Sequence, residues 1–188
     1  MKKLIFSAVV FVSLFSYGQR GVSDEWLLSI GVNALNSLGT QSPINSPDDW
    51  ALKYPIAVAA EKQWTRDLAI EVSASVNGIS EDDRFDPAAA PRNFTYFALD
   101  TNVKYYFGER IFPRTEWLDF YANGGVGFFH ISEVNITGNL GGGVLVWLNT
   151  NRSFGLRAQI MGKFAINNAE SGFDNNHYQY TLQAVFKL

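Results

Sequence analysis

The sequence predicts an all-β protein: an eight-stranded antiparallel up-and-down transmembrane β-barrel with a side-chain-filled lumen. Three observations predict this fold. Eight segments alternate two kinds of side chain with a period of two, which is the period of a β-strand. The breaks between these segments differ in length and charge, as connections at two unlike ends would. One set of alternating positions carries small residues and balanced charges, which fits a narrow interior better than a water-facing surface.

The first four strands are expected at residues 25–35, 52–64, 68–76 and 94–107. In each of them, aromatic or aliphatic residues occupy every second position. The positions between them hold Ser29 in the first strand, Ala57 in the second and Glu71 in the third. The fourth strand has the clearest alternation, and its polar positions include Asp100 and Lys104. Each segment therefore has one apolar and one polar or small face.

The last four strands are expected at residues 117–128, 138–148, 153–165 and 177–188. Their polar positions hold Gly125 in the fifth strand, Gly141 in the sixth and Arg157 in the seventh. The eight segments are between 9 and 14 residues long. Strands of soluble sheets average about 5–6 residues, whereas a strand needs about 9–11 to cross a bilayer. Strand length therefore favours a membrane barrel.

The seven breaks indicate two unlike ends of the barrel. Four of them are expected to be external loops, at residues 36–51, 78–93, 129–137 and 166–176. The other three, at residues 65–67, 108–116 and 149–152, are expected to be periplasmic turns. This division follows the pattern of membrane barrels, which have short periplasmic turns and longer external loops. The four loops hold nine acidic residues and two arginines, a net charge of −7, and the three turns carry +1. An even number of strands places both termini on the periplasmic side.

The polar set of positions is assigned to the lumen, where four acids face four bases: Glu61, Glu71, Asp100 and Asp119 against Lys104, Arg157, Lys163 and Lys187. Buried charges must be paired, so this balance is expected of a closed interior. Three of these residues, Glu61, Glu71 and Lys104, lie at the same depth as Arg157 across the lumen. We expect a plug of ion pairs that prevents conduction. The alternative is a soluble, lipocalin-like barrel whose polar face is solvated.

Aromatic residues of the apolar set gather near the strand ends, as in the interfacial girdles of membrane barrels. The girdle on the turn side is expected to contain Trp26, Trp64, Tyr105, Phe107, Phe120, Phe154 and Phe186. The girdle on the loop side is expected to contain Tyr54, Phe97, Phe128, Phe164, Tyr178 and Tyr180.

Residues 1–18 have the features of a secretory signal peptide. Lys2 and Lys3 precede a twelve-residue run that is largely apolar, and small residues stand three and one positions before Gln19. A helix that spans a membrane needs about 20 residues, so the run is too short to be an anchor. We expect residues 19–188 to form a single β-barrel domain. The chain has 188 residues, no cysteine and a net charge of −3, which argues against disulfides, thiolate metal sites and nucleic-acid binding.

Nearly all of the chain after residue 25 resembles the transmembrane domain of the OmpA/OmpX-type outer-membrane barrels, without the peptidoglycan-binding domain of longer relatives. The resemblance rests on residues 26–33, 99–105, 121–127 and 139–143, on Trp147 and on the last strand. It implies the outer membrane of a Gram-negative-type bacterium, contact with outer-membrane lipid and lipopolysaccharide, and insertion by the outer-membrane machinery. That machinery usually reads a terminal Phe, whereas this chain ends in Leu188.

The sequence offers little catalytic chemistry. Its two histidines, His130 and His177, stand near loop boundaries and lack the spacing of a metal site. A lipid-modifying enzyme would need His177 with Ser171 and Asp174, or His130 with Ser132 and Glu133, and neither set is diagnostic. We expect no enzyme activity, cofactor or metal. The expected external loops also contain a group of acidic residues: Asp48, Asp49, Glu81, Asp82, Asp83 and Asp86. This group could bind divalent cations or a basic partner, or it could only keep the surface solvated.

The expected function is that of a non-enzymatic outer-membrane barrel with a structural or interaction role, not an open pore. One alternative is an accessory subunit of a larger outer-membrane complex, in which part of the wall contacts a protein partner. A further alternative is a lipid-modifying barrel enzyme.

Overall fold

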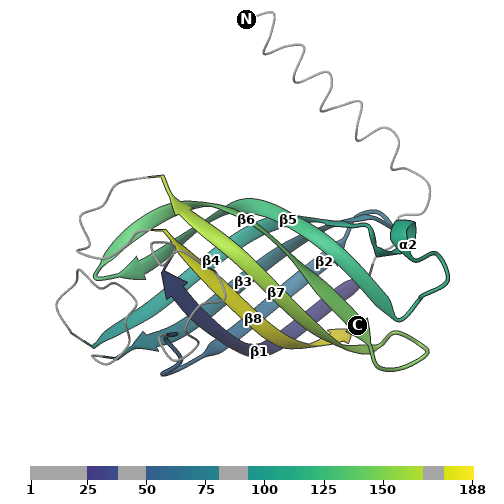
Figure 1. The fold of residues 1–188 in the computed structure, drawn as a ribbon, viewed down its shortest axis with the longest axis horizontal. Helices are drawn as coiled ribbons and strands as arrows, with labels where there is room; N and C mark the ends of the chain where they lie inside the picture. The colour runs from purple at the N-terminus through teal and green to yellow at the C-terminus, as the bar shows by residue number, and fades with distance from the viewer. Residues whose placement is uncertain (1–24, 38–49, 81–92, 167–175) are drawn as a thin grey trace, which may run out of the picture.

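Eight antiparallel strands follow one another in chain order and close into a barrel, because β1 pairs with both β2 and β8 (Figure 1). This computed structural model describes residues 25–37, 50–80, 93–166 and 176–188. The strands are β1 (Trp26–Ser37), β2 (Ile56–Gln63), β3 (Leu68–Ile79), β4 (Phe94–Tyr106), β5 (Leu118–Ile131), β6 (Glu133–Trp147), β7 (Phe154–Ala165) and β8 (His177–Lys187). The predicted eight-stranded barrel is confirmed. The expected signal peptide, residues 1–18, lies outside the described residues.

The two ends of the barrel are distinguished by their connections. The turn end carries residues 64–67, the four-residue helix α2 (Gly108–Ile111) and residues 148–153. The C terminus points toward the same end (Figure 1). The opposite end, the loop end, carries the β5–β6 connection. None of the described helices has both the length and the apolar character needed to cross a bilayer.

The sequence prediction of a loop at residues 129–137 is wrong. β5 runs to Ile131 and β6 begins at Glu133, so one residue, Ser132, separates the strands. Ser132 has a φ of 60°, in the left-handed region that tight turns require. The strands continue because residues 129–137 keep their alternation: Asn135 and Thr137 point into the lumen and are fully buried.

The second strand also differs from its prediction, because it begins at Ile56 instead of residue 52. Pro55 stands directly before it, and proline cannot donate a ladder hydrogen bond. Upstream of the proline, Ala51 forms an isolated bridge with Leu35 of β1. The chain therefore stays beside β1 here, without the regular register of a strand.

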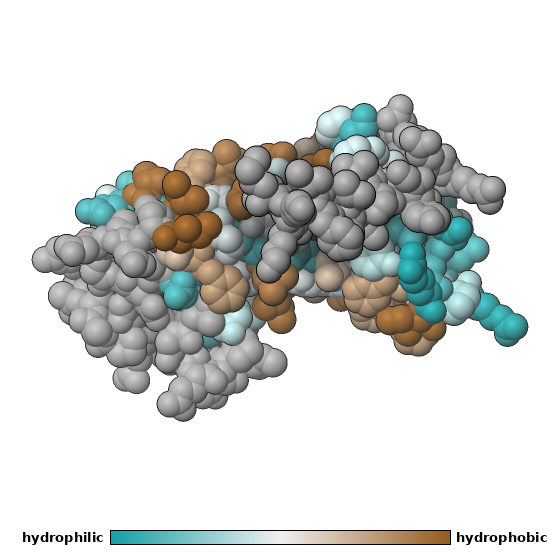
Figure 2. All heavy atoms as spheres, turned by 90° about the horizontal axis from the view of Figure 1, so that it is seen from above, coloured by the Kyte–Doolittle hydropathy of each residue, from teal (hydrophilic) through white to brown (hydrophobic). Residues whose placement is uncertain are grey.

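The strand alternation separates an apolar outer wall from a polar interior. Outward residues such as Ile30, Val72 and Val126 are 56%, 46% and 60% exposed. Inward residues include many polar side chains that are at most 7% exposed. Figure 2 shows hydrophobic residues along the wall and hydrophilic residues gathered at the end that carries α2. The polar set of positions therefore faces the lumen, as the sequence predicts.

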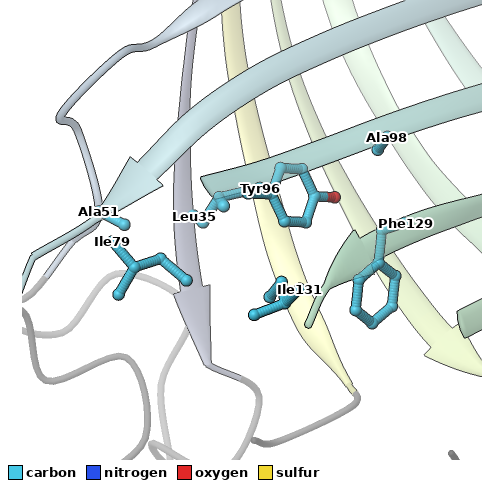
Figure 3. Packing of buried hydrophobic residues seen from close by; sticks show 7 residues of the cluster. All are labelled: Leu35, Ala51, Ile79, Tyr96, Ala98, Phe129 and Ile131. Atoms are coloured by element: carbon cyan, nitrogen blue, oxygen red, sulfur yellow. The ribbon is translucent and has the colours of Figure 1, made fainter. Parts of the chain in front are cut away.

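Two apolar clusters lie inside the barrel, one near each end. The cluster at the loop end contains Leu35, Ala51, Ile79, Tyr96, Ala98, Phe129 and Ile131 (Figure 3). The cluster at the turn end contains Leu27, Ala69, Tyr106, Tyr121, Leu145 and Val185. Charged and polar side chains occupy the space between them, so side chains fill the lumen from one cluster to the other.

Candidate functional site in the barrel lumen

Four buried charges from four strands meet across the lumen and form what we call the quartet: Glu61 of β2, Glu71 of β3, Lys104 of β4 and Arg157 of β7. All four side chains are at most 2% exposed. Arg157 reaches both acids, with its Nη1 2.7 Å from Glu71 Oε2 and its Nη2 2.7 Å from Glu61 Oε2. Lys104 Nζ lies 3.2 Å from Glu61 Oε2 and also forms an ion pair with Glu71. The quartet is electrically neutral.

The strand register explains why these two bases are needed. Glu61 and Glu71 stand directly opposite each other on neighbouring strands. Like charges in that position repel each other, and burial strengthens the repulsion because the interior screens charge weakly. Lys104 approaches from the next strand and Arg157 from across the barrel. Each base contacts both acids, so neither carboxylate faces the other without a cation between them.

Neutral polar and aromatic side chains complete the quartet. The hydroxyl of Tyr106 donates a 2.7 Å hydrogen bond to Glu61 Oε1, and Arg157 Nη1 donates to Ser29 Oγ at 3.3 Å. Tyr121 lies beside both bases, with its ring centroid 4.6 Å from Lys104 Nζ. These partners were not identified from the sequence as part of the network. The sequence did place Ser29, Tyr106 and Tyr121 at inward positions. That placement was the available signal, because the inward residues around the quartet must fill the same cross-section of the lumen.

Glycines give the quartet its space. A Cβ added at Gly143 would lie 2.5 Å from the hydroxyl oxygen of Tyr121 and 2.7 Å from its Cζ. Real Cβ atoms essentially never approach other atoms within 3.0 Å. The glycine in β6 thus makes room for the tyrosine that packs against the two bases.

A second charged pair lies closer to the loop end. Lys163 Nζ is 2.7 Å from Asp100 Oδ2, and both side chains are buried. Asn139 donates a 2.9 Å hydrogen bond to the other oxygen of Asp100 and accepts one from Thr137. Asp100 and Lys163, both members of the predicted network, therefore form a separate pair with neutral polar neighbours.

Two residues of the predicted balance lie at the turn end instead of in the buried lumen. Asp119 is half-buried and accepts a 2.9 Å hydrogen bond from the backbone N–H of Gly108. Lys187 pairs with Glu25, which precedes β1, at 2.6 Å. Both residues point inward as the alternation requires, but they lie beyond the apolar cluster of the turn end, where water enters.

The two histidines lie on opposite faces of the wall. His177 is fully buried inside the loop end, where its Nε2 lies 2.9 Å from the Tyr96 hydroxyl and its ring meets Phe129 edge-on at 4.7 Å. His130 is exposed on the outer face of β5. His177 stands at a loop boundary, as expected, because β8 begins there, and its place in the inward set of that strand turns its side chain into the barrel. Ser171 and Asp174, its expected partners, lie outside the described residues.

The predicted aromatic girdles are found on the outer face at both ends. At the turn end, the ring centroids of Phe154 and Phe186 are 5.2 Å apart, and those of Phe107 and Phe120 are 6.5 Å apart. At the loop end the pair Phe97–Phe128 is 6.1 Å apart. The structure places further aromatic residues in the same two bands, which the prediction did not include: Phe112 and Trp117 at the turn end and Trp50, stacked on Tyr180, at the loop end.

The acidic loop residues Asp48, Asp49, Glu81, Asp82, Asp83 and Asp86 lie outside the described residues. Within the described part of the chain, no three His, Asp or Glu side chains come together in a group that could hold a metal ion.

Comparisons with known proteins bear on the fold. No protein-family model and no curated protein matches the chain. Solved structures do match: Ail, the attachment invasion locus protein of Yersinia pestis, has a TM-score of 0.53 at 12% identity over 88% of this chain and 99% of its own. Neisserial surface protein A has a TM-score of 0.54 at 12% identity over 90% and 99%. The outer membrane protein AlkL reaches 0.55 at 11% identity over 90% and 93%. The chain therefore has the fold of the eight-stranded outer-membrane β-barrels.

Proposed function

We propose that this protein is a non-enzymatic outer-membrane barrel, related in type to OmpA and OmpX, with a structural or interaction role and no open pore. The observation that carries the proposal is the neutral, fully buried quartet, which crosses the lumen between two apolar clusters. An ion entering this lumen would have to displace paired charges and pass both clusters. The energetic cost of separating buried ion pairs opposes that passage.

The outer wall supports placement in a Gram-negative outer membrane after export by the signal peptide. A barrel can cross hydrocarbon because its closure leaves no unpaired strand edge. Large apolar side chains are exposed on the outer face of all eight strands, among them Ile30, Val58 and Leu140. Water would not stabilise such a surface, whereas lipid would. In this placement the turn end and both termini face the periplasm.

Planar-bilayer recording tests the absence of a pore. We expect the folded wild-type protein to insert without steady single-channel currents, because the quartet fills the lumen. Arg157→Ala removes the side chain that spans the barrel and should raise the frequency of brief openings. An exposed control, Arg66→Ala, should leave the recording silent. Steady large currents from the wild type would rule out the closed lumen.

The outer wall also favours a second role, as an accessory subunit of a larger outer-membrane complex. An apolar groove of about 580 Å³ runs over β1 to β4, where the outward residues Ala60 and Ala74 are smaller than their neighbours. Small residues let membrane-embedded elements approach closely. The proposed occupant is an apolar ridge of another outer-membrane protein. If this groove contacts only lipid, the protein is a solitary barrel.

Native mass spectrometry after gentle extraction separates these two roles. A stoichiometric partner that is lost in Ala74→Phe, which fills the groove, would establish the subunit role. Ala122→Phe places the same ring on the outer face away from the groove and should retain the partner. A protein that is extracted alone from its native membrane is a solitary barrel. Catalysis is not part of the proposal, and unchanged lipid A acyl chains in a deletion strain would agree with that.

A further inference from the structure

The turn end of the barrel contains an open cavity that the quartet does not use. Its volume is about 460 Å³, within the range of about 300–1,000 Å³ typical of small-ligand sites. Tyr106 and Leu145, members of the apolar cluster at the turn end, form its floor, and Phe107 and Trp147 line it as well. We call it the mouth cavity.

Ion pairs surround the mouth cavity and occupy all four of the bases that line it. Two pairs join residues 66–67 to α2: Arg66 with Glu109, and Arg110 with Asp67 at 2.7 Å. The hydrogen bond from Arg110 to Asp67 raises the pKa of the arginine. The other pairs are Arg152 with Glu116 at 3.0 Å and Lys187 with Glu25 at 2.6 Å.

One acid of the mouth cavity has no such base. Among the described residues, no lysine or arginine nitrogen lies within 4.0 Å of the carboxylate of Asp119, which lines the cavity beside Tyr106 and Trp147. The backbone N–H groups of Gly108 and Phe120 hold this carboxylate in place without neutralising it. The cavity thus has one excess negative charge next to an apolar, aromatic floor.

We propose that the mouth cavity binds a primary alkylammonium group, such as a lysine side chain or a diamine. The ammonium would donate to Asp119, and its methylene chain would pack against the rings of Tyr106 and Trp147. Aromatic faces attract cations, which adds to the charge pairing. An ammonium fits better than a guanidinium, because two backbone donors already occupy Asp119 and a guanidinium is best bound by two free carboxylate oxygens.

Backbone NMR of the full protein in a non-ionic detergent tests this site, with 1,5-diaminopentane and N-acetyl-lysine methylamide as separate probes. We expect saturable shifts at the amides of Gly108 and Phe120 and at the indole of Trp147. Asp119→Asn keeps an acceptor for the Gly108 N–H but loses the charge, and it should weaken binding by about tenfold or more. Glu133→Gln, a change at an exposed carboxylate of the opposite, loop end, should leave affinity within about twofold.

The probes also separate the two sources of the ammonium. Binding of the diamine alone would identify a free amine as the ligand, and binding of the lysine amide would identify a peptide side chain; either result supports the site. Pentanol, which has the chain without the charge, should not bind. Absence of saturable shifts with either amine, or equal affinity in a folded Asp119→Asn protein, would overturn the proposal. Both outcomes are independent of whether the lumen conducts.

Discussion

At the scale of single residues, the lumen depends on each base of the quartet contacting two acids. Removing one base leaves the two directly opposed carboxylates with one positive charge between them instead of two. An exposed pair at the turn end behaves differently, because water replaces the lost partner. The free energy lost when an ion pair is broken therefore depends on how deep the pair lies in the barrel.

Arg157→Ala is expected to destabilise the barrel by about 3–5 kcal/mol, because it leaves buried carboxylates uncompensated. Urea unfolding in lipid vesicles measures the free energy. Arg66→Ala, in a pair whose arginine side chain is 73% exposed, should cost about 0–1 kcal/mol. Equal effects of the two substitutions would mean that the quartet is hydrated instead of buried.

The sequence predicted which residues face inward, but not how they are grouped. Alternation identified Glu61, Glu71, Lys104 and Arg157 as inward residues, and their similar distance from the strand ends predicted a common depth. The structure brings these four together. It could not show that Asp119 lies beyond the apolar cluster, because depth depends on the stagger between strands. The role of the Tyr106 hydroxyl was also hidden, since a tyrosine in an alternating pattern gives no sign of what its polar tip reaches.

At the scale of secondary-structure elements, the strands were predicted well and their ends less well. A period of two marks the interior of a strand, whereas its end depends on turn geometry and on pairing. The loop predicted at residues 129–137 failed for this reason: the alternation persists through a turn centred on Ser132, which lacks the glycine or proline that signals most turns. At β2 the pattern extended past Pro55, although a proline ends regular pairing there.

The left-handed turn at Ser132 allows a prediction about the β5–β6 connection. A β-branched residue is strained at a φ of 60°, so Ser132→Val should cost about 1–2 kcal/mol of unfolding free energy. Ser132→Gly removes the steric conflict and should stay within about 0.5 kcal/mol of the wild type. Glu133→Val introduces the same side chain at the neighbouring extended position and serves as the control. If both valine variants unfold at the same urea concentration, the left-handed turn is not present.

At the scale of the whole molecule, the barrel has its apolar surface outside and its charges inside. This arrangement is the reverse of a soluble protein's, and it makes the outer face sensitive to charge in a depth-dependent way. Val126 is 60% exposed near the middle of β5, so its side chain should lie near the centre of the bilayer.

Val126→Arg is expected to destabilise the inserted barrel by about 2–4 kcal/mol, because an arginine at the midplane must leave water. Leu52→Arg, at the loop end and 50% exposed, should cost about 0–1 kcal/mol, since its charge can reach the interface. Unfolding in vesicles of defined lipid measures both. A barrel whose outer face contacts water would tolerate the two arginines equally.

The β1–β8 pairing, with eleven facing residue pairs from Leu27–Lys187 to Ser37–His177, also limits when the protein can fold. One edge of β1 pairs with β2 and the other edge pairs with β8, the last strand to be synthesised. The backbone groups of that second edge therefore stay unpaired until β8 has left the ribosome. An unpaired edge is a template for aggregation, and contacts this distant along the chain form slowly. Closure of this barrel must therefore follow the synthesis of its last strand.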